Sequence, residues 1–392
     1  MKNSLLIVAG EKSGENYGAS VVRCFREMDP EARFFGIGGT KMEAEGVDIL
    51  FPMEDLAVVG VFEILSQLPR IRKIFSRIQD EIKARRPAAA VLIDSPDFNL
   101  RLAKKLHKLG VPVLYYISPT VWAWRKGRLK TIKKYVRQMC LIFPFEEDIY
   151  KKDGIPARFV GHPLLERVKT AFGKAEFIER YGLDSGQKLI TVLPGSRRSE
   201  IRFHMPVLIE ALKKIRHEVP VQFVLALAEG LDPDAFRSLI PLDSPPIKVL
   251  REHTYEAMAA ADLVLSACGT ANLEAALLEI PLIAFYRLSS LTYWTGLKLV
   301  KIRNYSIVNI LAGENIVPEL IQRDFTADNV FHEAMTVLES EDIRSAMRSQ
   351  FRRIRSLLGS ASASRNVALE LEALVRHLSS AGTRAREFLT DE

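Results

Sequence analysis

Short apolar runs alternate along the chain with longer segments in which apolar residues recur at helical spacing. Apolar runs of about four to eight residues are typical of strands buried in a parallel sheet, and the longer segments match amphipathic helices. An order of strand, helix and strand predicts βαβ units. The pattern therefore predicts an α/β protein with mostly parallel sheets.

The predicted elements form two series. The first ends at Gly161-His162-Pro163, and the second restarts with KLITVLPGSR at 188–197. Two similar halves of this kind are expected to form two Rossmann-like domains with a crevice between them. The first series has strands near 4–9, 33–37, 89–93, 111–117, 138–143 and 157–160 and helices that include 70–86 and 98–109, and the second has strands within 188–197, 221–227, 261–270 and 281–287.

The domain boundaries follow from these two series. We expect a first domain over residues 1–165, a second over 166–355 and a helical tail over 356–392. Within the tail, Ala361 to Ser379 has the pattern of an amphipathic helix, which can pack across the join of the two domains.

The composition indicates a soluble protein in a reducing compartment. The 392 residues, 48% hydrophobic and 26% charged, suit two or three globular domains. Cys24, Cys140 and Cys268 are scattered, so neither a disulfide framework nor a zinc site is indicated, and a cytoplasmic location fits best. The first apolar run stops at Gly10, too early for a signal peptide, and no stretch approaches the ~20 apolar residues of a membrane span.

The net charge of +7 favours an anionic partner, which can be a nucleic acid, a nucleotide or a membrane surface. No DNA- or RNA-binding signature is present. The basic run at 126–134 recurs at helical spacing, as a solvated helix face does. We therefore expect no nucleic-acid partner.

Two carboxylates, Asp94 and Asp97, follow one predicted strand directly and precede a predicted helix. In a parallel sheet the crevice beyond the carboxyl ends of the strands is the usual ligand site, so an Asp at a strand end faces substrate. Asp97 can equally cap the helix that follows, which is a common use of Asp.

Two further turns between strand and helix can hold an anion. In AGEKSGENYGA, Gly10 and Gly14 flank a turn that opens a helix, although the spacing is not that of a dinucleotide-binding motif. In LPGSRRSEI, Gly195 and Ser196 form a compact turn and Arg197 supplies a forked cationic donor. The alternative for the second turn is a tight turn with exposed arginines.

The segment SACGTANLEAALLEIPLIAFYR is the most specific nucleotide signal. Gly269 and Thr270 start a helix whose amide end can hold a pyrophosphate. Glu274 lies just over one turn further along and can accept hydrogen bonds from ribose hydroxyls. Alternatively, Glu274 only complements the helix dipole.

With these motifs the chain resembles the lipid-A-disaccharide synthase family, inverting glycosyltransferases of the GT-B fold. The resemblance implies transfer of 2,3-diacylglucosamine from its UDP derivative to 2,3-diacylglucosamine 1-phosphate, with inversion, to form the β-1,6-linked disaccharide of lipid A. The matching segments are AGEKSGE (9–15), IDSPDFNLRLAKKL (93–106), SPTVWAW (118–124), PFEEDIY (144–150), RFVGHPL (158–164), LPGSRRSEI (193–201), GTANLEAAL (269–277) and NILAGENIVPELIQ (309–322).

The chain departs from the family pattern at a few positions. Glu15 stands where the family has Asp in SGD, and Ile307-Val308-Asn309 stands where it has LPN. Cys268 and Asn272 replace small or hydroxyl residues beside Gly269. These differences concern donor contacts more than the reaction.

The resemblance, read with the chemistry of the motifs, assigns roles to particular residues. Asp94 is the expected base for the acceptor hydroxyl, and Asp97 or Glu11 would orient the base or the acceptor. Asn309 is expected to contact the donor, although the sequence alone favours a turn residue. The expected UDP-sugar-binding residues are Ser13, Gly14, Gly195, Ser196, Arg197, Arg198, Glu200, Gly269, Thr270, Glu274, Arg287 and Asn309.

No metal or other cofactor is expected. Arg197, Arg198 and the helix end at Gly269 can together meet the charge of the departing UDP. No D-x-D motif lies in a place that contradicts this expectation.

Both substrates carry acyl chains, so a membrane contact without a membrane span is expected. The segment 56–78 is more apolar than one buried helix face needs and is followed by basic residues, as in interfacial elements on anionic membranes. The alternative is an ordinary core helix with a basic solvent face. The expected membrane or acyl contacts are Val58, Val59, Val61, Phe62, Leu65, Leu68, Arg70, Arg72, Lys73 and Trp122, while Trp124, Tyr293 and Trp294 can line an acyl groove or fill the core.

These expectations describe a peripheral enzyme of the Gram-negative inner membrane. Its first domain would face the acceptor and the membrane, its second would bind the UDP-sugar, and a homodimer is possible. One alternative is another GT-B enzyme acting on a UDP-sugar, such as a lipid II-type glycosyltransferase or a UDP-N-acetylglucosamine 2-epimerase. A second is a non-catalytic, membrane-associated lipid-binding protein. The segments IDSPDFN and SPTVWAW argue against the first, and the joint presence of Asp94, Arg197 and Glu274 argues against the second.

Overall fold

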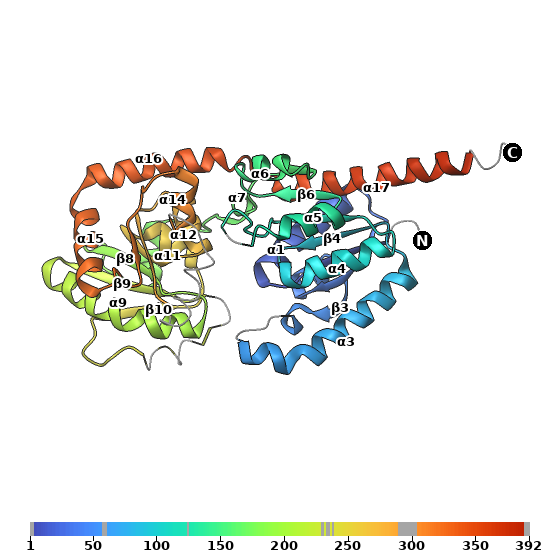
Figure 1. The fold of residues 1–392 in the computed structure, drawn as a ribbon. Helices are drawn as coiled ribbons and strands as arrows, with labels where there is room; N and C mark the ends of the chain where they lie inside the picture. Colours follow the sequence, from blue (N-terminus) through green and yellow to red (C-terminus); the bar gives the residue numbers. More distant parts are fainter. Residues whose placement is uncertain are drawn as a thin grey trace. The chain divides into compact units, whose positions relative to one another are not determined.

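The computed structural model describes residues 4–56, 61–123, 125–228, 231–232, 236, 239–288 and 304–387, without the side chains of 61–68 and 377–387. The chain forms two compact units, one of Met1–Pro163 with Leu358–Glu392 and the other of Leu164–Leu357 (Figure 1). The predicted tail is thereby divided. Helix α16, Glu341–Leu357, belongs to the second unit, and helix α17, Ala363–Glu387, belongs to the first.

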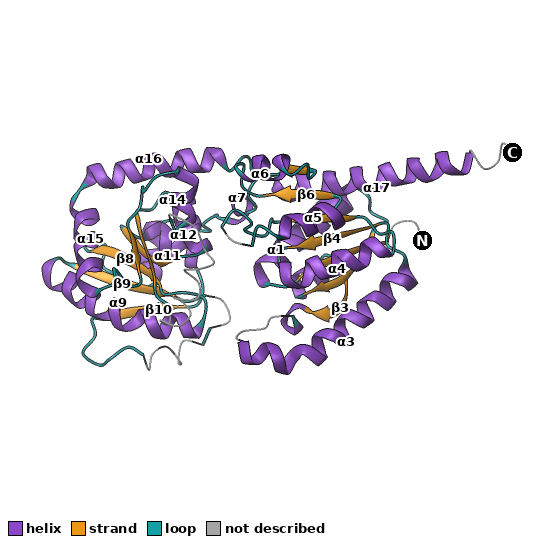
Figure 2. Cartoon of the chain, in the orientation of Figure 1, coloured by secondary structure: helices purple, strands orange, loops and turns teal. Residues whose placement is uncertain are grey.

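The first unit is built on a seven-stranded parallel sheet in the order β3-β2-β1-β4-β5-β6-β7. Strands are drawn in orange in Figure 2. The order reverses between β1 and β4, so the carboxyl ends of these two strands flank a topological switch point, where ligands bind in such sheets. The strands are β1 Ser4–Ala9, β2 Arg33–Gly38, β3 Asp48–Pro52, β4 Ala89–Ile93, β5 Val113–Tyr116, β6 Gln138–Leu141 and β7 Ala157–Phe159.

Helices cover both faces of this sheet. One core cluster contains residues of α1, Lys12–Met28, and of α17, and the other contains residues of α3, Val61–Arg85, and of α4, Pro96–Lys108. The smaller helices are α2 Thr40–Ala44, α5 Arg128–Tyr135 and α6 Glu146–Lys152. Helix α17 is fastened to the sheet by Asn366, whose Nδ2 donates to the Val160 carbonyl at 2.9 Å.

The second unit repeats this plan with a six-stranded parallel sheet in the order β10-β9-β8-β11-β12-β13. Its strands are β8 Lys188–Leu193, β9 Val221–Ala226, β10 Ile247–Leu250, β11 Leu263–Ala267, β12 Leu282–Tyr286 and β13 Glu319–Ile321. Its other helices are α7 Leu164–Arg167, α8 Lys174–Arg180, α9 Arg198–Glu218, α11 Thr254–Ala260, α12 Thr270–Leu277, α14 Ile307–Ala312 and α15 Ala327–Glu339.

The predicted α/β class and the parallel sheets are confirmed. Three strands, β3, β10 and β13, were not predicted, and each lies at an edge of its sheet. Their residues are short runs that are only partly buried, so they lack the continuous apolar pattern of the central strands. Within the described residues, no helix is both long and apolar enough to cross a bilayer.

Candidate functional site

The turn between β4 and α4 holds two consecutive residues in the left-handed region, Asp94 at φ +47° and Ser95 at φ +42°. Such conformations cost on the order of 1–3 kcal/mol each for residues other than glycine, and they cluster at functional sites. Hydrogen bonds fix the main chain here. The Asp94 carbonyl accepts from Asn99 Nδ2 at 2.8 Å and from Tyr115 Oη at 2.5 Å, and the Asp94 N–H donates to the Tyr116 carbonyl.

Gly10, which follows β1, allows this turn to approach closely. A Cβ at Gly10 would lie 2.4 Å from Ser95 Oγ and 2.9 Å from Ser95 Cβ, so any other residue would displace the turn. Glu11, the N-cap of α1, comes next and lies within electrostatic reach of Asp94. The switch point thus brings together two of the predicted catalytic residues, Asp94 and Glu11.

Burial, with a smaller contribution from the negative charge of Glu11, raises the pKa of Asp94 from 3.8 to about 6. The Ser95 N–H and the positive charge of Arg128 oppose this rise. A carboxylate with a pKa near 6 is ionised at neutral pH and is a stronger base than a free Asp, which suits general-base catalysis.

The remaining predicted residues of this turn region differ in exposure. Ser13 is exposed, whereas Gly14 is buried in contact with Ile93 and Ala9. Glu15 is buried, and its Oε1 accepts from the Lys41 N–H at 2.9 Å, so this carboxylate caps the start of α2.

Asp97 has a different environment from Asp94. Its carboxylate is largely exposed, and its Oδ1 accepts from Arg125 at 3.0 Å and from Arg128 at 2.9 Å. The N-cap of α4 is Ser95, and Asp97 makes no capping hydrogen bond. Asp97 therefore holds two arginines, and the capping alternative is wrong.

In the second unit, the carboxylate of Glu200 occupies the β8–α9 turn. The carboxylate of Glu200 accepts from the N–H groups of Ser196 and Arg197 at 3.1 and 3.2 Å and from Tyr286 Oη at 2.9 Å. Gly195 has φ +126°, and a Cβ there would meet Glu200 Oε2 at 2.9 Å. Glu200 thus acts as an internal cap of the turn that is predicted to cradle a phosphate.

The arginines of this turn remain at the surface. Arg197 is paired with Glu200 at 3.1 Å, yet 64% of its side chain is exposed, and Arg198 is exposed as well. Both guanidinium groups can therefore reach a ligand outside the turn.

Arg287 is turned into the protein, contrary to the predicted donor contact. Its guanidinium donates to the main-chain carbonyls of Gln322 and Phe325, which positions the chain after β13. Its N–H donates at 3.0 Å to Nε2 of His204, whose Nδ1 lies 2.7 Å from the Pro194 carbonyl. His204 is buried, burial lowers its pKa, and it ties the β8–α9 turn to the end of β12. No local pattern singles out His204, because its partner Arg287 lies 83 residues away in the chain.

The N-terminus of α12 is open, as the prediction of a nucleotide site requires. Gly269 and Thr270 are exposed, and a Cβ at Gly269 would have no neighbour within 4 Å. Gly269 has extended backbone, so its conformation does not require glycine, and the missing side chain leaves space in front of the helix.

Glu274 faces the side of the same helix and accepts from Tyr255 Oη at 3.0 Å. Burial raises its pKa, while Tyr255 and Arg167 oppose the rise. A half-buried carboxylate one turn from an open helix end is well placed for ribose hydroxyls.

Asn309 uses its whole hydrogen-bonding capacity inside the protein. Its Nδ2 donates to Val317 and Glu319, and its Oδ1 accepts from the N–H groups of Ile316 and Val317, all at 2.8–3.0 Å. An Asn side chain has two donors and two acceptor positions, so none is left for the donor sugar. These hydrogen bonds give Asn309 a structural role in holding the segment before β13.

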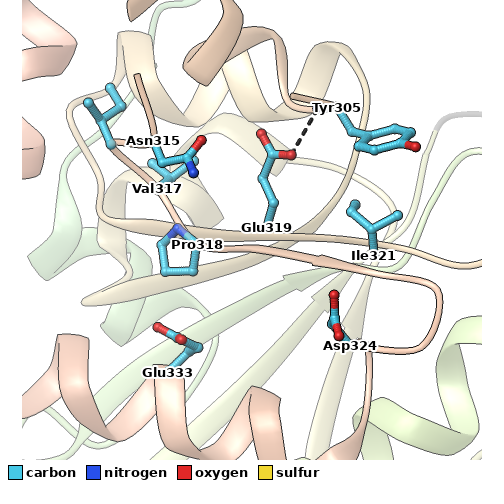
Figure 3. A pocket seen from close by; sticks show the side chains of 9 residues that line it. Tyr305, Asn315, Val317, Pro318, Glu319, Ile321, Asp324 and Glu333 are labelled. Carbon is cyan, nitrogen blue, oxygen red and sulfur yellow. Dashed lines mark hydrogen bonds between the residues drawn. The ribbon is translucent and has the colours of Figure 1, made fainter. Parts of the chain in front are cut away.

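Beside Asn309 lies a pocket of about 540 Å³, shown in Figure 3. Glu319, whose carboxylate accepts from the Tyr305 N–H, lines it together with Asp324 and Glu333. Carboxylates repel a pyrophosphate. This pocket is therefore a poor nucleotide site, and the open end of α12 is the better one.

The predicted membrane segment coincides in part with α3. Ile74, Ile78 and Ile82 are buried against the sheet, so the second half of this helix is an amphipathic core helix. Its exposed basic residues include Arg70, Arg72 and Lys73, and Arg70 pairs with Asp55. Val58, Val59, Trp124, Tyr293 and Trp294 lie outside the described residues, as do the side chains of Val61, Phe62, Leu65 and Leu68.

Trp122 is half-buried and packs edge-on against Phe145, with ring centroids 5.5 Å apart. Glu146, in the adjoining helix α6, is buried, and burial raises its pKa from 4.5 to about 7, while Ser118, the Phe143 N–H and Trp122 oppose the rise. The sequence pattern does not single out this carboxyl group, since EED at a helix start is typical of exposed residues.

Among the described residues, no group of three or more His, Cys, Asp or Glu side chains is arranged to hold a metal ion.

Comparison with known sequences gives one family. The family model described as lipid-A-disaccharide synthetase matches residues 5–372. A lipid-A-disaccharide synthase from Geobacter sulfurreducens is 40% identical over 365 residues, which are 93% of this chain and 95% of that protein. One from Nitrosococcus oceani is 41% identical over 372 residues, which are 94% of this chain and 96% of that protein.

Comparison with solved structures supports the predicted GT-B fold. The UDP-GlcNAc 2-epimerase from Neisseria meningitidis bound to UDP-GlcNAc has a TM-score of 0.63 at 11% identity and covers 95% of this chain and 99% of its own. The calicheamicin glycosyltransferase CalG4 has a TM-score of 0.62 at 14% identity, with 95% and 98% covered. At these identities the likeness concerns the fold alone.

Proposed function

This chain belongs to the lipid-A-disaccharide synthase family, and from that premise we propose how its residues divide the work of the reaction. The enzyme is an inverting glycosyltransferase that uses a UDP-sugar donor and a lipid acceptor. The reaction moves 2,3-diacylglucosamine from UDP to 2,3-diacylglucosamine 1-phosphate, forming the β-1,6-linked disaccharide. It needs a base for the acceptor hydroxyl and a charge-stabilising site for the departing UDP.

Asp94 is the proposed base. The observation that carries this assignment is the left-handed turn at Asp94 and Ser95, clamped by Asn99 and Tyr115 at the switch point of the first sheet. A hydroxyl becomes a good nucleophile only when its proton is removed in the transition state, and a positioned base contributes typically ~10²–10⁴-fold. The raised pKa of Asp94 matches that task.

Glu11 and Asp97 support this base in different ways. Glu11 contributes negative charge that raises the pKa of Asp94. Asp97 holds Arg125 and Arg128 in place through its Oδ1.

The second unit binds the donor in this proposal. The open amide end of α12 at Gly269 and Thr270 would receive the pyrophosphate, and Glu274 would accept from the ribose hydroxyls. Arg197 and Arg198 would meet the negative charge that develops on UDP as it leaves. With cationic side chains in that role, the reaction requires no metal ion.

The acyl chains of both substrates require access to lipid. We propose that the segment 56–78 supplies it, with the exposed basic residues of α3 contacting anionic headgroups at the inner membrane. We also propose that two chains associate into a homodimer, and this proposal rests on the family resemblance alone.

The testing experiment is an assay in detergent micelles with UDP-2,3-diacylglucosamine and 2,3-diacylglucosamine 1-phosphate, with and without EDTA. Formation of disaccharide and UDP, lost in Asp94→Asn and unaffected by EDTA, is the expected result. Loss of activity with EDTA, restored by a divalent cation, would contradict the metal-free mechanism. Lipid binding without any product would instead identify a lipid-binding protein.

A further inference from the structure

Arg125 and Arg128 share the Asp97 carboxylate, and Arg128 also acts electrostatically on the proposed base, Asp94. Arg125 follows the SPTVWAW segment, and Arg128 is the first residue of α5. Both donate to one oxygen, Oδ1 of Asp97, at 3.0 and 2.9 Å. Lys126, between them in sequence, is exposed. The cluster therefore has more positive than negative charge.

The geometry of this cluster is that of an anion site. Arg125 has φ +52°, an uncommon conformation for a residue other than glycine, and about half of its side chain is exposed. Arg128 is nearly buried, so its guanidinium has a fixed position. The Arg125–Asp97 pair is exposed on both sides, and such ion pairs contribute little to stability, so a stronger anion can compete with Asp97 for Arg125.

We propose that Arg125 and Arg128 bind the phosphomonoester of the acceptor sugar, an inference that rests on the proposed function. A guanidinium presents two parallel N–H donors that match phosphate oxygens, and two guanidinium groups can engage a dianion from two sides. In this view the Asp97 carboxylate marks the position of the phosphate when no substrate is bound.

The location selects the acceptor rather than the donor. Arg128 acts electrostatically on Asp94, so the cluster lies near the group that would deprotonate the acceptor hydroxyl. In the acceptor, C1 carries the phosphate and C5 carries the CH2OH group with the reactive hydroxyl, and both carbons neighbour the ring oxygen. A base and a phosphate site in the same unit would hold that ring at two points, which orients the hydroxyl.

The test compares 2,3-diacylglucosamine 1-phosphate with 2,3-diacylglucosamine, which lacks the phosphate. Binding of each to full-length protein in neutral detergent is measured alongside steady-state kinetics. Arg125→Ala should weaken binding of the phosphorylated acceptor, and raise its KM, by roughly 10–100-fold, as loss of a charged hydrogen bond does. Its binding of the unphosphorylated acceptor and its KM for the donor should equal those of the wild type.

Two further variants sharpen this test. Arg125→Lys keeps the charge but not the fork, so it should recover part of the lost affinity. Arg101→Ala removes an exposed arginine from α4, the helix that carries Asp97, and should leave binding of both acceptors unchanged.

Three outcomes would overturn the inference. Equal loss on both acceptors would show that Arg125 only shapes the loop, and a raised donor KM alone would assign it to the pyrophosphate. Weaker binding to phosphatidylglycerol vesicles with unchanged acceptor binding would assign it to lipid headgroups. The binding measurement decides the inference even if no disaccharide forms, whereas absence of product from wild-type protein counts against the proposed function alone.

Discussion

The hydroxyl of Tyr115, buried in the central part of the first sheet, donates to the main-chain carbonyl of Asp94 at 2.5 Å. Burial raises the pKa of Tyr115, so the hydroxyl keeps its proton and remains a donor at all working pH values. The carbonyl belongs to a left-handed residue, whose conformation needs such support. A buried strand residue thereby sets the direction of the proposed base.

Replacing Tyr115 with Phe should release this support. We expect kcat to fall by about tenfold with little change in either KM, because the base is displaced while the substrate sites are intact. Tyr116→Phe is the matched control, since it removes the neighbouring buried hydroxyl from the opposite core cluster. Equal kcat values for the two variants would show that the Tyr115 bond does not position Asp94.

Isosteric Asp→Asn variants of Asp94 and Asp97 should differ clearly in kcat. Asp94→Asn should lower kcat by ~10²–10⁴-fold, as removal of a general base does. Asp97→Asn loses an exposed carboxylate between two arginines and should lower kcat by less than about tenfold. Steady-state kinetics with circular dichroism as a folding control measures both. A larger fall in kcat for Asp97→Asn than for Asp94→Asn would instead identify Asp97 as the base.

The activity should depend on pH through Asp94. Its pKa is raised to about 6, and a base works only when deprotonated, so kcat/KM should fall as the pH drops below about 6 and level off above 7. Glu11→Gln removes a negative neighbour, which lowers the pKa of Asp94 and should move the acid limb to lower pH. If the acid limb of the kcat/KM profile did not move, a group other than Asp94 would control it.

Asn309→Ala should affect stability more than donor binding. The change leaves the N–H groups of Ile316 and Val317 without their partner and removes one of the donors to the Glu319 carboxylate, at a cost of ~2–4 kcal/mol in the free energy of unfolding. Thermal unfolding should show the loss. The KM for the donor, measured well below the new Tm, should rise less than about threefold. A large rise with an unchanged Tm would restore the predicted donor contact.

Glu146 should make stability depend on pH. Its pKa is raised from 4.5 to about 7, so the folded protein binds an extra proton between these values, and the contribution of Glu146 to stability is fully present below pH 4.5 and is lost as the pH rises through 7. Glu146→Gln removes this titration. Relative to wild type, the variant should therefore gain Tm between pH 5 and pH 8, measured by calorimetry. Parallel Tm curves would show that Glu146 titrates normally.

The central strands and the position of Asp94 followed from local pattern alone. Continuous apolar runs identify strands buried on both faces, and a carboxylate directly after such a strand lies at the ligand edge of a parallel sheet. The same reasoning singled out Gly269 and Glu274 at the start of α12. It did not distinguish this helix end from that of α9, where the same order of strand, glycine and helix is closed by Glu200. The edge strands β10 and β13 lacked this continuous pattern and were missed.

The partners of the polar side chains required the folded chain. Glu200, Arg287 and Asn309 had the chemistry of ligand-binding residues, yet each is occupied by amides, carbonyls or a hydroxyl of the protein itself. His204 contacts Arg287, a residue 83 positions away. The sequence by itself determined the buried strands and the carboxylate that ends one of them, since burial follows local hydrophobic periodicity. Only the tertiary structure decided which polar groups remain available to substrate, because hydrogen-bond partners are set by distances that folding creates between remote residues.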